Sequence, residues 1–171
     1  MKFIGYAFNG IVMGAALFTL PAVAAESVDK YPSRPIRVMG QGVGSTADYL
    51  SRYIGQKLTE RWGQAVVVDN RAGAGGTLSA EVVAKAVPDG YSLVMGHAGP
   101  MVSAVALYPN RGYDPLKDFS PITKTTTGVT VLVLHPSVPA KNVQELIALS
   151  KQKPLSYASA GNGTISHLTG E

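Results

Sequence analysis

The chain alternates between short apolar runs and segments of helical periodicity, with glycine-rich loops at the changes. Residues 35–39 and 65–69 are apolar runs typical of strands, and the second is continuous enough for a buried parallel sheet. Residues 92–95 form a third run, after a turn at Pro88-Asp89-Gly90. Strand, loop and helix repeated in this order predict an α/β fold.

The two helices expected between these strands each have their apolar residues on one face. A capping box of Ser45 and Asp48, with Asp in place of the usual Glu, precedes the first helix. The apolar positions are Tyr49, Leu50, Tyr53, Ile54, Leu58 and Trp62 in the first helix, and Leu78, Val82, Val83 and Ala86 in the second.

The second half of the chain repeats the pattern. Residues 129–134 and 155–158 are expected strands, and a second capping box at Asn142 and Glu145 precedes a helix. A glycine loop at 160–164 leads into another helix from Ile165. The chain stops at Glu171, about one turn into that helix, so we expect a sequence cut short.

Residues 1–25 have the features of a secretory signal peptide. Lys2 precedes an apolar stretch over residues 11–20, which is followed by Pro21 and small residues up to Ala25. The alternative is a transmembrane anchor, but the stretch is shorter than the roughly 20 residues that a spanning helix needs. We therefore expect cleavage near residue 25 and a mature chain in a bacterial periplasm.

Composition excludes several functional classes. The chain has no cysteine, so disulfide scaffolds, thiolate metal sites and cysteine nucleophiles are ruled out. Its three histidines are far apart, which argues against a zinc site. The net charge is +4, but no basic run exceeds two residues, so no nucleic-acid partner is expected. The GxGxxG, GxxxxGK[ST] and GxSxG motifs are missing, and the sequence predicts no catalytic residue, metal or cofactor.

Four loops carry the candidate binding residues, because in open α/β sheets ligands bind at the carboxyl ends of strands. These loops span residues 40–45, 70–76, 97–100 and 160–164. Each precedes a helix whose free N–H groups favour an anion, which predicts a small carboxylate ligand. The alternative is that turns simply require Gly, Ser and Asn. The candidates are Val43, Gly44, Ser45, Thr46, Asp48, Ala74, Gly75, Gly76, Ala98, Gly99, Ala160, Gly161, Asn162, Gly163, Thr164 and His167.

Six motifs in order resemble the Bug family, the substrate-binding proteins of tripartite tricarboxylate transporters. The family's GGxxD, NRPGAGG and PDGYTL are similar to residues 44–48, 70–76 and 88–93. Its YDPxKDF and YASAGNGSxxHL are similar to residues 113–119 and 157–168, and residues 31–37 (YPSRPIR) resemble the start of its mature chains.

The resemblance implies a type II periplasmic-binding-protein fold, a two-lobed Venus flytrap whose cleft holds a carboxylated solute. It also implies docking on a membrane permease. Family chains are roughly twice as long, so residues 26–125 would form most of lobe one. Residues 126–171 would form the start of an incomplete lobe two.

Two departures from the family pattern fall in the candidate loops. The first loop, Gln41 to Ser45, is one residue shorter than the family's PFPAGG and lacks its aromatic residue. His97 and Ala98 stand where the family often has Thr and Ser. Two alternatives to a solute-binding protein remain: a nonfunctional truncated remnant of one, or an extracytoplasmic enzyme that uses the same loops.

Overall fold

Three parallel strands form the sheet of the computed structural model, which describes residues 27–171. The signal peptide expected over residues 1–25 lies outside the described residues. The strands are β1 (Ile36–Gly40), β2 (Val66–Asn70) and β3 (Ser92–Val94), and their order in the sheet is β2-β1-β3. This confirms the parallel α/β fold that the sequence predicts.

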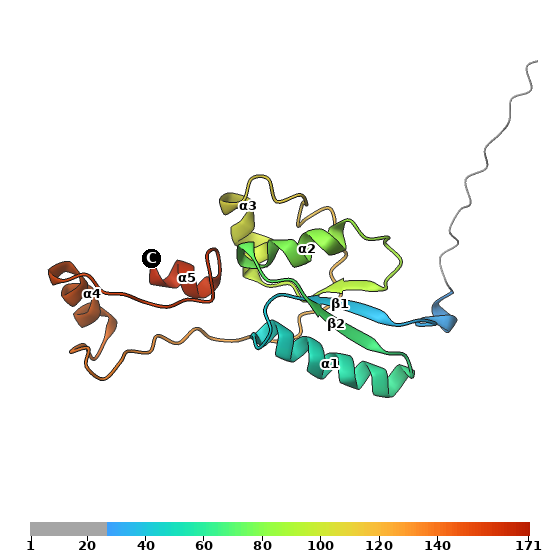
Figure 1. Cartoon of the computed structure of the whole chain (residues 1–171), viewed down its shortest axis with the longest axis horizontal. Coiled ribbons are helices and arrows are strands. Elements are labelled where there is room, and N and C mark those ends of the chain that lie inside the picture. The colour runs from blue at the N-terminus through green and yellow to red at the C-terminus, as the bar shows by residue number, and fades with distance from the viewer. Residues whose placement is uncertain (1–26) are drawn as a thin grey trace, which may run out of the picture.

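Helices cover both sides of this sheet (Figure 1). Helix α1 (Thr46–Trp62) packs on β1 and β2, and α2 (Thr77–Ala84) packs on β1 and β3. Since β1 is central and covered on both faces, it holds the core residues Ile36, Val38 and Met39.

The apolar run in β2 is less buried than the sequence predicts. β2 lies at the edge of the sheet, and Val67 is 52% exposed. Helix α1 covers the other face, where a Cβ on Gly55 would lie 3.0 Å from Cγ1 of Val66. The run of valines is therefore half-buried on the face toward α1 and exposed on the other.

Small residues, rather than the large apolar ones, make the most buried face of each helix. In α1 the buried residues are Asp48, Ser51 and Gly55, while Tyr49 is 67% exposed and stacks on Tyr53 with ring centroids 6.3 Å apart. In α2 they are Thr77, Ser79 and Ala80, and Leu78 and Val82 are exposed. Small side chains let a helix approach the sheet closely, and helical periodicity alone does not show this.

A short helical segment follows β3 and begins at Gly99, inside the loop that the sequence analysis placed over residues 97–100. It consists of a single π-helical turn, η3 (Gly99–Ser103), continued by α3 (Ala104–Leu107). The buried hydroxyl of Tyr113 donates to the carbonyl oxygen of Pro100 at 2.6 Å and holds this segment against the chain that follows. Two further short turns are η1 (Val28–Lys30) and η2 (Ala74–Gly76), the second between β2 and α2.

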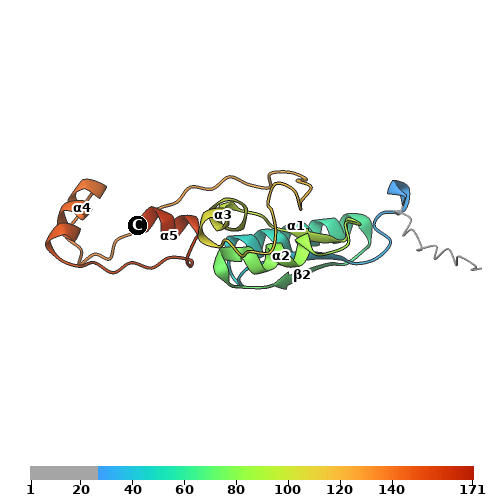
Figure 2. The ribbon, with the colours of Figure 1, turned by 90° about the horizontal axis from the view of Figure 1, so that it is seen from above.

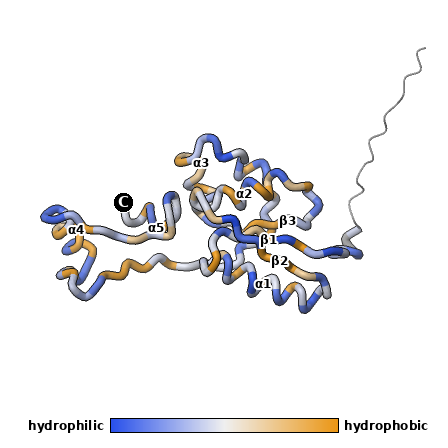
Figure 3. The backbone as a smooth tube through the Cα atoms, in the orientation of Figure 1, coloured by the Kyte–Doolittle hydropathy of each residue, from blue (hydrophilic) through white to orange (hydrophobic). Residues whose placement is uncertain are grey.

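The C-terminal part extends away from the sheet (Figures 1 and 2). It contains α4 (Val143–Gln152) and α5 (Ile165–Gly170), as the sequence predicts. The strands expected over residues 129–134 and 155–158 are wrong for this structure, because neither segment has a strand partner within residues 27–171. The first is an exposed, partly apolar linker (Figure 3).

None of the helices within residues 27–171 combines the length and hydropathy of a membrane-crossing segment.

Candidate functional site

The loops that follow the three strands meet at the end of the sheet where the strands have their carboxyl ends, because the strands are parallel. A Cβ on Gly99 would lie 2.5 Å from the carbonyl oxygen of Gly75. A Cβ on Gly76 would lie 2.5 Å from the side chain of Gln41. The loops after β1, β2 and β3 are therefore in direct contact, and only glycine fits at these points without displacing a neighbour.

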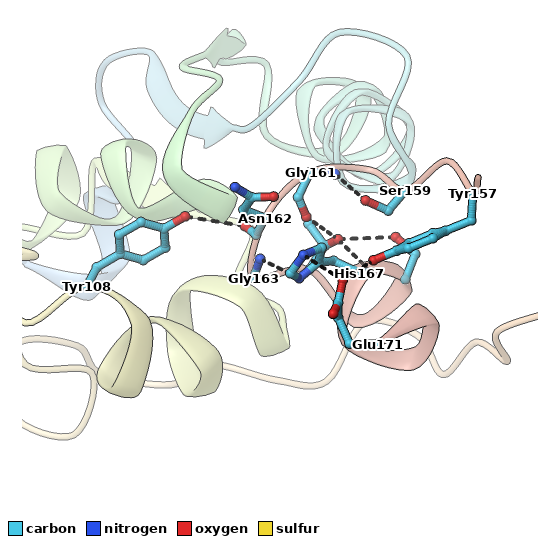
Figure 4. A network of polar contacts seen from close by, with 10 residues as sticks. Tyr108, Tyr157, Ser159, Gly161, Asn162, Gly163, His167 and Glu171 are labelled. Atoms are coloured by element: carbon cyan, nitrogen blue, oxygen red, sulfur yellow. Dashed lines mark hydrogen bonds and ion pairs between the residues drawn. The ribbon is translucent and has the colours of Figure 1, made fainter. Parts of the chain in front are cut away.

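The C-terminal glycine loop joins this cluster (Figure 4). A Cβ on Gly75 would lie 2.8 Å from the carbonyl oxygen of Asn162. The hydroxyl of Tyr108, just after α3, donates to the same oxygen at 3.4 Å, and a Cβ on Gly163 would lie 3.1 Å from Leu107. The cluster therefore unites loops from both halves of the chain.

Other candidates lie beside the cluster rather than in it. The Cβ positions of Gly44 and Gly161 face open space, and Val43 is exposed. The remaining candidates begin the helices or the turns before them. Thr46 is the first residue of α1, Ala74 the first of η2, Ala98 the N-cap of η3, and Ala160 donates its N–H to Ser166 Oγ at 3.0 Å.

Several backbone N–H groups that the sequence analysis assigned to an anion are used by the chain itself. The N–H of Gly44 donates to Asp48 Oδ2 at 2.9 Å, and that of Ser45 to the Gly42 carbonyl at 3.1 Å. The N–H of Gly76 donates to the carbonyl of Gly73 at 2.9 Å. A ligand at these loops would have to compete for these donors or rely on others.

Asp48 joins three parts of the site. Its carboxylate accepts from Asn70 Nδ2 at 2.7 Å, from Arg52 Nε at 2.8 Å and from the N–H of Gly44. These hydrogen bonds, that from Asn70 first, hold the pKa of Asp48 below its ordinary value. Asp48 is therefore a buried anion that connects the start of α1 to the end of β2, in addition to its expected place in the capping box.

The same cap is built twice in the chain. In α1, Ser45 Oγ accepts from the N–H of Asp48 at 3.2 Å, after Gly44 at φ 80°. In α5, Thr164 Oγ1 accepts from the N–H of His167 at 3.4 Å, after Gly163, also at φ 80°.

The residue three positions after each cap reaches back to the glycine. The N–H of Gly163 lies 3.5 Å from His167 Nδ1, just as that of Gly44 donates to Asp48. The two halves of the site thus present equivalent turns with a carboxylate in one and an imidazole in the other.

Gln41 and His97 belong to the cluster, although the sequence analysis did not select them as binding residues. His97 Nε2 contacts Gln41 Oε1, and its Nδ1 accepts from the N–H of Gly99 at 3.0 Å. Burial lowers the pKa of His97. Their positions in the sequence could have identified them, since each residue follows the carboxyl end of one of two adjacent strands.

Two hollows of the described chain lie away from this cluster. One, of about 320 Å³, is lined by residues including Arg34, Asp89 and Tyr91, near the amino ends of β1 and β3. The other, of about 450 Å³, lies between the linker and α4 and includes His135 and Glu145. Within residues 27–171, no group of three or more His, Asp or Glu side chains is placed to hold a metal ion.

A parallel α/β core with glycine-rich loops gathered at the carboxyl ends of its strands is the architecture of a ligand-binding α/β domain. Residues 50–171 match the tripartite tricarboxylate transporter family receptor, and the chain belongs to this family of receptors. It is 36% identical over 171 residues to a UPF0065 protein of Bordetella bronchiseptica, a match that covers 95% of this chain and 51% of the relative.

Solved structures agree with this assignment. The periplasmic binding protein BugD matches with a TM-score of 0.66 and 36% identity, over 82% of this chain and 48% of BugD. Rpa4515 of R. palustris, solved with adipate, matches with a TM-score of 0.68 and 32% identity over the same shares. MatC of Rhodopseudomonas palustris, with bound malate, matches over 53% of this chain and 31% of its own, with a TM-score of 0.50 and 41% identity.

The chain spans about half the length of the curated relatives that it matches.

Proposed function

We propose that this chain is part of an extracytoplasmic solute-binding protein that captures a small carboxylate for a tripartite tricarboxylate-type transporter. The observation that carries the proposal is the contact between Gly75 and Asn162, which brings the loops of the sheet together with the C-terminal glycine loop. A ligand at this point would touch both halves of the chain.

The chemistry of the ligand follows from the loops and from the relatives. Two solved relatives hold the dicarboxylates adipate and malate. The loops of this chain lead into helix N-termini, where backbone dipoles favour negative charge. We therefore propose a small carboxylate, bound by Asn162 and by loop donors that the chain does not already use.

The proposed site lies between two lobes. Residues 26–125 are proposed as lobe one and residues 126–171 as the beginning of lobe two. We place the proposed cleft where Gly75 and Tyr108 border residues 162–163. Closure of two lobes over the ligand would exclude water and strengthen each polar contact. A closed, loaded receptor would then dock on the permease subunits of the transporter, after export to the periplasm through residues 1–25.

Calorimetry with a panel of mono-, di- and tricarboxylates tests this function. We expect binding on the order of micromolar or tighter for at least one of them, about 8 kcal/mol. Gly75→Leu and Gly163→Leu should weaken binding more than about tenfold, or about 1.4 kcal/mol, because each side chain would enter the loop contact. Gly63→Leu is the matched control, since Gly63 also has a positive φ, of 68°, and its Cβ would meet nothing within 4 Å.

Thermal melting shows whether each variant is folded, and Asn162→Ala tests the proposed contact between the Asn162 side chain and the ligand without a change at a glycine. Unchanged affinity in all three loop variants would contradict the proposed site. A folded chain that binds none of the carboxylates would contradict the function and favour a nonfunctional remnant, whereas turnover of a bound carboxylate would favour an enzyme.

A further inference from the structure

His97 has a single neutral tautomer that satisfies both of its contacts. A backbone N–H can only donate, so the bond from Gly99 to Nδ1 requires that Nδ1 be unprotonated. The proton of the neutral ring is then on Nε2, which faces Oε1 of Gln41. The side-chain oxygen of Gln41 therefore accepts from His97, and its amide nitrogen points the other way.

The orientation of Gln41 depends on this bond. Its Nε2 is buried and has no hydrogen-bond partner among residues 27–171. A Cβ on Gly76 would lie 2.6 Å from this nitrogen, so the amide rests against the loop after β2. Burying an unpaired donor is unfavourable. The bond from His97 satisfies the oxygen of the amide, so only its nitrogen is left unpaired.

The same imidazole also positions the loop after β3. His97 holds the N–H of Gly99, and Gly99 lies against the carbonyl of Gly75. Gly75 in turn borders Asn162. One side chain thus connects the loops after β1, β2 and β3, and it reaches the C-terminal loop through Gly75.

We propose that His97 is a positioning residue: with its proton on Nε2 it orients Gln41 and Gly99 and so sets the spacing of the ligand-binding loops. The expected effect on carboxylate affinity rests on the proposed function, whereas the geometry of His97 does not.

Protonation of His97 would undo this arrangement. The imidazolium carries a proton on Nδ1, which would oppose the N–H of Gly99, so the loop after β3 would separate from the ring. Burial favours the neutral ring. The titratable side chains packed around this loop include Glu81, which binds Lys85, and Arg37, which binds Asp69. Tyr113 also lies against it and donates to the carbonyl oxygen of Pro100, while η2, η3 and α3 carry no titratable side chain.

Nitrogen NMR of the histidines, titrated from pH 8 to pH 4 without ligand, tests the geometry. We expect the Nε2–H tautomer for His97, and amide signals of Gly76 and Gly99 that shift with the midpoint of His97. An Nδ1–H tautomer, or glycine signals that do not follow this titration, would overturn the proposal.

Calorimetry with adipate and malate at the same pH values tests the consequence. Apparent affinity should fall about tenfold for each pH unit below the pKa of His97, because only the neutral form is competent. His97→Asn keeps an acceptor for the N–H of Gly99 but loses the hydrogen bond to Gln41. This variant should bind the carboxylate more weakly at pH 8, and its affinity should no longer change with the pKa of His97. His135→Asn is the matched control, since His135 is exposed and bonds only locally to Ser137.

Titration of the ligand itself is common to the three proteins and cancels in their comparison. Binding by His97→Asn with the affinity and pH profile of the wild type would refute the role of His97. If neither adipate nor malate binds, the pH series is run with whichever carboxylate of the panel does bind. If none of the panel binds, the proposed function fails, and the NMR titration alone decides whether His97 positions the loops.

Discussion

The carboxylate of Asp48 accepts a hydrogen bond of 2.7 Å from the side-chain amide of Asn70, 22 residues further along the chain. Asp48 belongs to the first turn of α1, and Asn70 is the last residue of β2. The bond thus ties a helix start to a strand end at the edge of the sheet where the glycine loops meet.

Asp48→Asn should lower the melting temperature and flatten its dependence on pH. The hydrogen bonds lower the pKa of Asp48 in the folded state. Its stabilising contribution is therefore present above the ordinary aspartate pKa of about 3.9, and it is lost as the pH falls through the lower, folded-state pKa. Melting followed by circular dichroism between pH 7 and pH 2 measures this.

The control for Asp48 is Asp29→Asn, because the side chain of Asp29 is exposed. A pH profile of Asp48→Asn that is parallel to the wild type down to pH 2 would show that Asp48 does not contribute in this way.

Ser79→Ala should lower the free energy of unfolding by about 0.5–1.5 kcal/mol, because it removes a buried hydrogen bond while the carbonyl of Gly40 keeps the N–H of Arg71 as a donor. Ser79 is fully buried in α2, and its hydroxyl contacts the carbonyl oxygens of Gly40, at the end of β1, and of Arg71, just after β2. Urea unfolding gives the difference. Ser150→Ala is the control: its hydroxyl also donates to a backbone carbonyl, that of Ile147, but Ser150 is exposed. A loss as small as the control's would refute the role.

The two equivalent caps should differ in what they stabilise. Ser45→Ala should cost about 1 kcal/mol of global stability, since Ser45 caps the long helix α1 in the body of the sheet. Thr164→Ala should leave global unfolding unchanged and increase amide exchange only in α5, which has no buried residues. Urea unfolding and hydrogen exchange separate the two effects, and a global loss from Thr164→Ala would contradict this prediction.

The linker over residues 129–134 should promote self-association. Val131 is 71% exposed and Val133 is 81% exposed, and an uncovered apolar segment with strand-forming residues is an aggregation site. The double variant Val131→Lys, Val133→Lys should raise the highest concentration at which the chain is still monomeric, and light scattering measures this limit. Lysines at Ser137 and Ala140 provide a control of equal charge, and equal gains from both pairs would show that charge alone is responsible.

The local signals in the sequence determined β1, β2 and β3 and the starts of the longer helices, although they also predicted strands over residues 129–134 and 155–158 that the structure lacks. The starts of α1 and α4 follow from Ser45 with Asp48 and from Asn142 with Glu145, because a capping box depends only on residues within one turn. The three strands and the edge at which their loops gather follow from the alternation of apolar runs and helices, because parallel strands joined by helices have one possible arrangement of their ends.

Only the tertiary structure decided which surfaces are covered and which polar groups find partners. It placed β2 at the edge of the sheet, left residues 129–134 unpaired, and used the N–H groups of Gly44, Ser45 and Gly76 within the chain. It also joined Gln41 to His97, 56 residues apart. The reason is that burial and long-range hydrogen bonds depend on which segments meet in space, whereas the patterns in a sequence report only near neighbours along the chain.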